Sequence, residues 1–307
     1  MKIVFMGTPD FAVPCLQALI DGGHEILGVY TQPDKPKGRG YQMSFSPVKE
    51  LAMEHQLPVF QPKTFKDEEV VAQLRQLAPQ LIVVVAYGKI LPKSVLEIPE
   101  LGCVNVHGSL LPKYRGAGPI QWSVINGEQE TGITTMFMGE GLDTGDMILK
   151  RSIPIGEDET SGELYERMEK LGAQCLMETI SLFEKGDVAR EPQKDEASSY
   201  APMLDKKLAL LDFQKTGREI HNLVRGLNPW PVAFTKLRGK VLKVYAAKEI
   251  PGYTGQPGEV LDEKRFIVGC GDGAVEFLEI ALEGKKRMAS ADFLRGYHLK
   301  KGEKLGE

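Results

Sequence analysis

The segment 102–107 places an amide and an imidazole two residues apart, at Asn105 and His107. If this segment is a strand, its side chains alternate between two faces, so these two side chains share a face about 7 Å apart. Ligands bind at the carboxyl ends of strands in open α/β sheets. The pair suits acyl transfer, because both groups can bond to a carbonyl oxygen that becomes an oxyanion. The imidazole can also move a proton near neutral pH.

Asn105 and His107 also fit a strand-end turn, in which the amide caps the backbone and the ring is a hydrogen-bonded neighbour. The two residues alone leave catalysis and turn chemistry open. No Ser or Cys beside them is an obvious covalent nucleophile, and Cys103 on the same face is typical of core packing. We therefore expect the nucleophile to be an amine of the substrate.

The glycine-rich loop 139–146 follows a predicted strand at 132–138 and contains Asp143. A carboxylate beside His107 would hold the tautomer of the ring and favour its charged form. A calcium loop is the rival interpretation, but the acidic spacing does not match one. A simple Asp-Gly turn also remains open.

The loop 32–40 is rich in Pro and Gly and carries Lys35, Lys37 and Arg39. Such a loop can grip phosphate, although a solvated surface loop has the same composition. Charge is also unevenly distributed along the chain, with a balance of −10 over residues 1–205 and +6 over residues 206–307. This asymmetry suggests that the C-terminal third meets an anionic partner, although a solvated, Lys-rich surface fits it equally well.

The elements that must position these residues follow an α/β pattern. The run 81–85 is β-branched and apolar without alternation, which is typical of a parallel strand covered on both faces. Strands alternate with helices, which predicts a doubly wound, Rossmann-like, mostly parallel sheet. The predicted strands are 2–6, 26–30, 81–85, 102–107 and 132–138, and the predicted helices include 47–55 and 67–77.

The second half of the chain changes character. A capping box at 160–163 begins a helix that ends at Gly186, and the non-periodic segment 190–206 is predicted to be a linker. A second capping box begins at Thr216, and short alternating runs after it predict a small antiparallel β-barrel of the OB-like type. The predicted domains are therefore 1–189 and 207–307, joined by the linker.

The composition excludes several classes of protein. The chain has 307 residues, is 42% hydrophobic and 26% charged, and has a formal charge of −4, as expected for a soluble globular protein. It has no apolar run long enough to span a membrane and no Cys-x-x-Cys. The His spacing predicts no metal site, and the loop at Gly7 lacks the further glycines of a nicotinamide-binding fingerprint. We expect a cytoplasmic monomer.

Two runs of sequence resemble a known family. The run 104–116 reads Val-Asn-Val-His-Gly-Ser-Leu-Leu-Pro-Lys-Tyr-Arg-Gly, and the run 142–145 reads Leu-Asp-Thr-Gly. Together they resemble the signature of the 10-formyltetrahydrofolate-dependent formyltransferases. The opening Gly-Thr-Pro at 7–9, the loop 32–40 and the Asn-Pro-Trp-Pro run at 228–231 narrow the resemblance to members that act on tRNA.

The resemblance implies that the formyl group of 10-formyltetrahydrofolate passes to the α-amine of methionine on charged initiator tRNA. It implies a catalytic trio of Asn105, His107 and Asp143, in which Asn105 and His107 polarise the formyl oxygen and Asp143 orients His107. It further implies a folate-binding segment and a set of tRNA contacts. The folate-binding residues are Ser109, Leu110, Leu111 and Pro112, and the tRNA contacts are Lys35, Lys37 and Arg39.

Three alternatives remain. Relatives that formylate glycinamide ribonucleotide or amino sugars, or that hydrolyse formyltetrahydrofolate, share the trio but need neither the basic loop nor a positive barrel. A tRNA-binding protein with an inactive enzyme domain is the alternative from another class, and the intact trio argues against it. A nicotinamide-dependent dehydrogenase is disfavoured by the loop at Gly7.

Overall fold

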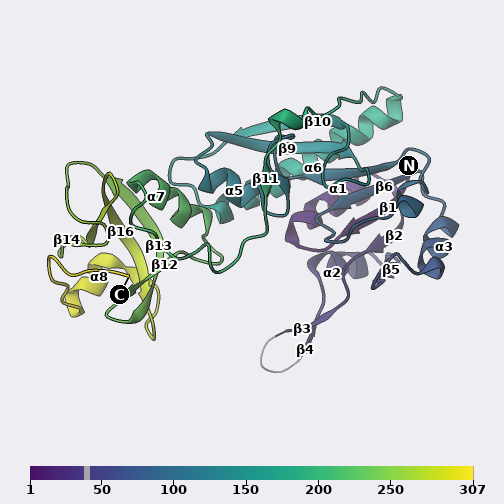
Figure 1. The fold of residues 1–307 in the computed structure, drawn as a ribbon. Helices are drawn as coiled ribbons and strands as arrows, with labels where there is room; N and C mark the ends of the chain where they lie inside the picture. Colours follow the sequence, from purple (N-terminus) through teal and green to yellow (C-terminus); the bar gives the residue numbers. More distant parts are fainter. Residues whose placement is uncertain (38–41, 307) are drawn as a thin grey trace. The chain divides into compact units, whose positions relative to one another are not determined.

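The computed structural model describes residues 1–37 and 42–306. They form two compact units, and Figure 1 shows the course of the chain through both. Unit 1 comprises residues 1–116, 131–153 and 165–200, and unit 2 comprises residues 117–130, 154–164 and the chain from residue 201 onward. Both units are therefore assembled from separate stretches of the chain, whereas the predicted domains are contiguous. The boundaries at 189 and 207 stay a prediction.

Seven strands form the main sheet of unit 1, in the order β10-β9-β7-β6-β1-β2-β5. Each neighbouring pair within the run β7-β6-β1-β2-β5 is parallel, and β9 is antiparallel to β7. The predicted mostly parallel sheet is confirmed. Its strands are β1 (Lys2–Gly7), β2 (Glu25–Tyr30), β5 (Val59–Phe60), β6 (Leu81–Val85), β7 (Cys103–His107), β9 (Glu130–Phe137) and β10 (Met147–Pro154).

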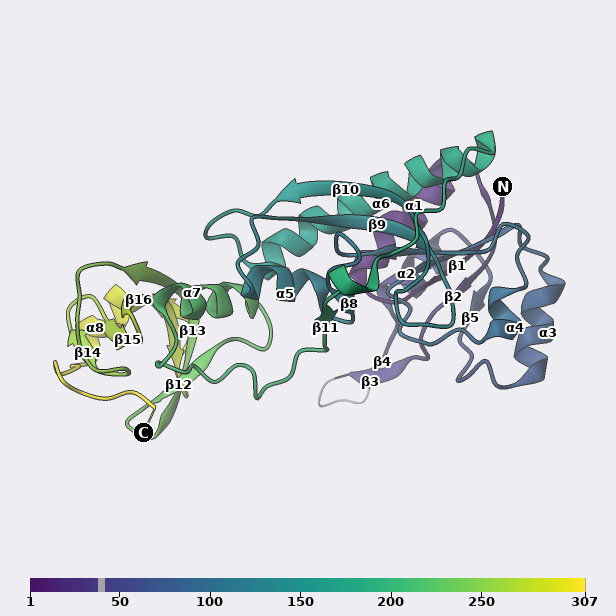
Figure 2. The ribbon, with the colours of Figure 1, turned by 45° about the horizontal axis from the view of Figure 1, so that its top comes forward.

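Helices cover both faces of this sheet, which explains the continuous apolar strands. On one face, Ile82 and Val84 of β6 pack with Val71 and Leu74 of α3. On the other face, the hydroxyl groups of Thr135 in β9 and Thr179 in α6 are hydrogen-bonded at 2.7 Å. Figure 2 shows α6 lying along β9 and β10. The helices are α1 (Val13–Asp21), α2 (Pro47–Glu54), α3 (Glu68–Gln76), α4 (Lys93–Leu96) and α6 (Ser161–Lys185).

The basic loop predicted at 32–40 includes part of a hairpin between β2 and α2. Strands β3 (Lys35–Lys37) and β4 (Gln42–Ser44) are antiparallel, and Arg39 lies outside the described residues. At the base of the hairpin, Asp34 bonds to Lys49 and to Gln61, and the bond with Lys49 holds the pKa of the Asp34 carboxyl below its usual value. The base of the hairpin is therefore fixed to α2.

The segment predicted as a linker at 190–206 is structured over much of its length. Glu191 forms a bridge with Met147, a 3-10 turn spans Asp195–Ala197, and β11 (Tyr200–Ala201) pairs with β8 (Arg115–Gly116). Residues up to 200 belong to unit 1. Backbone hydrogen bonds to distant strands hold this segment, and such bonds have no local sequence pattern.

Unit 2 contains an antiparallel sheet in the order β12-β13-β16-β15-β14, with β17 paired to β16. Helix α7 begins with the predicted capping box of Thr216 and Glu219, which is confirmed, and packs against β13. The elements are α5 (Pro119–Ile125), α7 (Gly217–Gly226), β12 (Phe234–Leu237), β13 (Lys240–Ile250), β14 (Val260–Asp262), β15 (Ile267–Cys270), β16 (Gly273–Leu282), β17 (Met288–Ala289) and α8 (Ser290–Gly296).

The C-terminal tail joins the two edge strands of this sheet. The N–H of Leu305 donates to the carbonyl of Gly258 beside β14 at 2.8 Å, and the N–H of Gly306 donates to the carbonyl of Lys236 in β12 at 2.9 Å. The Leu305 side chain is buried in the core of the unit. The guanidinium of Arg238 contacts Glu303 and lowers the pKa of that carboxyl. The tail thus helps to close the predicted small β-barrel, although the strand patterns did not predict that the tail takes part.

We predict that Leu305→Ala lowers the free energy of unfolding of unit 2 by about 2–5 kcal/mol, because it empties a core position that closes the sheet. Both tryptophans, Trp122 and Trp230, lie in unit 2, so their fluorescence during urea unfolding follows this unit. Leu278→Ala is the matched control, because that leucine is 42% exposed on β16, and we expect about 1 kcal/mol or less. Equal losses in the two variants would contradict a closing role for the tail.

Candidate active site

Strand β7 carries Asn105 and His107 at the carboxyl end of the parallel part of the sheet. Asn105 lies opposite Val84 of β6 and Met136 of β9, so it is paired on both sides. His107 lies opposite Thr134 of β9. The Asn105 side chain is half-buried and makes no hydrogen bond among the described residues. Its amide is therefore available to donate to a substrate oxygen.

Main-chain and carboxylate oxygens surround the ring of His107, which is buried. The Nε2 atom lies 2.9 Å from the carbonyl of Tyr114, and the Nδ1 atom lies 3.7 Å from Oδ2 of Asp143. A carbonyl only accepts hydrogen bonds, so Nε2 carries a proton. Nδ1 is then the ring nitrogen that faces the carboxylate of Asp143. The predicted neighbourhood of His107 and Asp143 is present in the structure.

Asp143 is held in an uncommon backbone conformation. Its φ is +52°, in the left-handed region, and its Oδ2 atom accepts a hydrogen bond of 2.8 Å from the N–H of Gly116. The carboxylate side chain is only 14% exposed. A non-glycine residue with positive φ costs stability and is often found at functional sites.

The segment 114–116 contacts both His107 and Asp143, a role that the sequence did not predict. Tyr114 supplies the carbonyl for His107, and Gly116 supplies the N–H for Asp143. Tyr114 also has a positive φ, +62°. Both residues lie within the quoted 104–116 run, but main-chain contacts carry no residue-type signal. Gln193, which contacts the Asp143 loop, was missed within the predicted linker.

The predicted folate-binding residues form a tight loop directly after β7. The buried Ser109 hydroxyl donates to the carbonyl of Lys113 at 2.6 Å, and the Thr134 hydroxyl donates to the carbonyl of Ser109 at 2.7 Å. Leu111 packs with the two methionines Met136 and Met147. Leu110 and Pro112 are half-buried. The loop is rigidly connected to the sheet, and folate binding by it stays a prediction.

Other candidate groups have structural explanations. Burial raises the pKa of the Cys103 thiol to about 12, as expected for core packing. In the described part of the chain, no cluster of three His, Cys, Asp or Glu side chains could hold a metal ion. None of the helices among the described residues has the length and apolarity needed to cross a bilayer.

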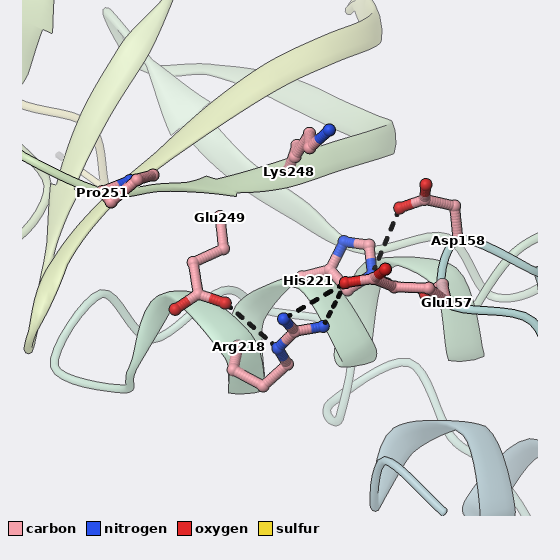
Figure 3. Close-up of a pocket in the computed structure, with 7 residues that line it drawn as sticks. All are labelled: Glu157, Asp158, Arg218, His221, Lys248, Glu249 and Pro251. Carbon is pink, nitrogen blue, oxygen red and sulfur yellow. Dashed lines mark hydrogen bonds and ion pairs between the residues drawn. The ribbon is translucent and has the colours of Figure 1, made fainter. Parts of the chain in front are cut away.

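A hollow in unit 2 lies between α7, β13 and the loop before α6 (Figure 3). In it, Arg218 contacts Glu249 at 3.0 Å and Glu157 at 3.4 Å. The two ring nitrogens of His221 lie 2.8 and 3.0 Å from the carbonyl oxygens of Ala247 and Glu157. These side chains bond to one another and to the backbone, and no predicted site residue lines the hollow.

We predict that Gly145→Ala destabilises the Asp143 loop, because a Cβ atom at this position would lie 1.8 Å from the carbonyl oxygen of Phe137. Backbone atoms cannot move aside as the end of a flexible side chain can. We therefore expect the free energy of unfolding to fall by about 1–3 kcal/mol or more, measured by denaturation followed with far-UV circular dichroism. Gly139→Ala in the same loop is the control, because its Cβ would meet no described atom within 4 Å. Unchanged stability of the Gly145 variant would refute the close approach.

Family models match both parts of the chain. The formyl transferase model matches residues 1–180, and the formyl transferase C-terminal domain model matches residues 203–298. A methionyl-tRNA formyltransferase of Alkaliphilus oremlandii is 53% identical over 310 residues, which cover 100% of both chains. Another, of Geobacter sulfurreducens, is 52% identical and covers 100% of this chain and 97% of the relative.

Solved structures share the fold at lower identity. The sugar 3N-formyl transferase WlaRD has a TM-score of 0.70 at 21% identity, over 93% of this chain and 99% of that one. HypX of Aquifex aeolicus in complex with tetrahydrofolic acid has a TM-score of 0.63 at 20% identity, over 96% of this chain and 47% of that one. Since both family models match and relatives more than half identical align along its full length, the chain belongs to the formyl transferase family.

Proposed function

We propose that this enzyme transfers the formyl group of 10-formyltetrahydrofolate to the α-amino group of methionine on charged initiator tRNA. The products are N-formylmethionyl-tRNA, used to initiate translation, and tetrahydrofolate. The full-length identity of 53% with a methionyl-tRNA formyltransferase carries the proposal. The position of His107 beside Asp143 supports it, because acyl transfer to an amine needs proton movement at the reacting centre.

Asn105 and His107 act on the formyl oxygen. As the free amine attacks the formyl carbon, the carbonyl oxygen gains negative charge. The amide of Asn105 and the protonated Nδ1 of His107 donate hydrogen bonds to that oxygen. Preorganised donors in a partly buried site stabilise such charge without reorganising at the moment of reaction.

Asp143 orients His107 and assists the movement of protons during the transfer. The attacking amine loses a proton when the new C–N bond forms, and N10 of the folate takes one when its bond to the formyl carbon breaks. The Asp143 carboxylate, 3.7 Å from Nδ1, stabilises the charged ring during this exchange. The hydrogen bond from Gly116 holds the carboxylate in place.

Substrate binding involves three parts of the chain. The segment Ser109, Leu110, Leu111 and Pro112 binds the folate, which the rigid attachment of this loop to β9 supports. The tRNA contacts at its acceptor end are Lys35 and Lys37, and also Arg39, which lies outside the described residues. The charge of +6 over residues 206–307 supports phosphate contacts in the C-terminal part. The enzyme acts as a monomer in the cytoplasm.

An acceptor panel tests the proposal. We expect transfer of labelled formyl from 10-formyltetrahydrofolate to Met-charged initiator tRNA, and none to uncharged tRNA, glycinamide ribonucleotide or amino-sugar nucleotides. The product is identified as N-formylmethionine after ester hydrolysis. Transfer to a small amine, or release of free formate alone, would assign a related activity instead. Tight tRNA binding without turnover would assign a binding protein.

We predict that Asn105→Ala and His107→Ala each lower kcat by about 10²–10³, because each removes one donor to the developing oxyanion. Affinity for the charged tRNA, measured by filter binding, stays close to that of the unsubstituted enzyme. His55→Ala is the control, because His55 is exposed at the end of α2. Unchanged kcat in both site variants would remove these residues from the mechanism.

A further inference from the structure

We propose that Gln193 is a positioning residue that holds the Asp143 loop in its catalytic conformation, an inference that rests on the proposed function. The Nε2 group of Gln193 donates to the carbonyl of Asp143 and to the carbonyl of Gly145, each at 2.8 Å. One side chain thus bonds to the main chain on both sides of Thr144. Gln193 reaches the loop from 50 residues away in the chain.

The other end of the Gln193 amide is fixed by Arg115. The Nε atom of Arg115 donates to Oε1 of Gln193 at 3.0 Å. The guanidinium only donates and the two loop carbonyls only accept, so one orientation of the amide satisfies all three groups. Among side chains of this length, a carboxylate lacks the two donors and an apolar chain lacks both functions. The position therefore demands glutamine.

The Asp143 loop needs such an external support. Asp143 has a φ of +52°. The preceding residues Glu140, Gly141 and Leu142 are exposed, so little packing holds the loop in place. Residues held in this backbone region persist when surrounding contacts over-determine them. The Gly116 bond holds the Asp143 carboxylate, and the Gln193 bonds hold its main chain. Together they set the direction of the carboxylate toward His107.

The segment that carries Gln193 also holds Tyr114, whose carbonyl is bonded to the His107 ring. The Ser199 hydroxyl accepts a hydrogen bond of 2.9 Å from the N–H of Tyr114, and the Ser199 carbonyl accepts one of 2.9 Å from the N–H of Arg115. Tyr114 supplies the carbonyl that bonds to His107. Residues 193–199 therefore hold both sides of the His107–Asp143 pair.

The test uses Gln193→Glu and Gln193→Met in the full-length enzyme. Glu keeps the length of the side chain and the contact with Arg115 but sets an oxygen against two carbonyls, and Met removes the donors without adding charge. We expect kcat to fall about 10- to 100-fold in both variants, as for small misplacements of a catalytic group. The KM values for folate and charged tRNA stay within about threefold. Gln73→Glu is the matched control, because Gln73 is exposed on α3.

Hydrogen exchange of the 140–146 amides provides a second readout that does not depend on activity. We expect exchange there to quicken in both Gln193 variants, while exchange in β1 and β6 is unchanged. Normal kcat in both variants, or a lowered kcat with unchanged exchange at 140–146, would overturn the proposal. If the unsubstituted enzyme fails to formylate the charged tRNA, the proposed function fails, and the exchange data still decide whether Gln193 holds the loop.

Discussion

The hydrogen bond from the main-chain N–H of Gly116 to the carboxylate of Asp143 is the interaction that joins the two halves of the candidate site. Asp143 lies on a largely exposed loop, whereas His107 lies at the end of a buried strand. The bond from Gly116 connects them, because the preceding Tyr114 carbonyl is bonded to the His107 ring. A three-residue segment therefore sets the relation between an imidazole and a carboxylate that lie 36 residues apart in the numbering.

Burial makes this arrangement chemically useful. The side chains of His107 and Asp143 are 6% and 14% exposed, so little water screens their interaction. A carboxylate removed from water needs hydrogen-bond donors, and the Gly116 N–H supplies one without adding a competing charge. Among the described residues, the Asn105 side chain has no hydrogen-bond partner in the same region. The site thus combines a carboxylate held by a main-chain donor, a ring with one nitrogen bonded to a carbonyl, and a half-buried amide.

Main-chain hydrogen bonds also join distant segments elsewhere in the molecule. The C-terminal tail closes the sheet of unit 2 through bonds to Gly258 and Lys236, and the segment 191–200 joins unit 1 through bonds to Met147 and Arg115. In each case a segment without regular side-chain periodicity forms backbone hydrogen bonds with strand or loop residues that lie far away in the sequence. The edges of a sheet carry backbone N–H and C=O groups that need hydrogen-bond partners, and these segments supply them.

The sequence by itself determined the parallel strands, the shared face of Asn105 and His107, and the capping box of Thr216, because these follow from side-chain periodicity and contacts within a few residues. It also identified the family through the 104–116 and 142–145 runs. Only the tertiary structure decided that Gly116 holds Asp143 and that Gln193 supports the same loop. These contacts join distant segments through main-chain groups, which every residue type shares, so no pattern of side chains announces them.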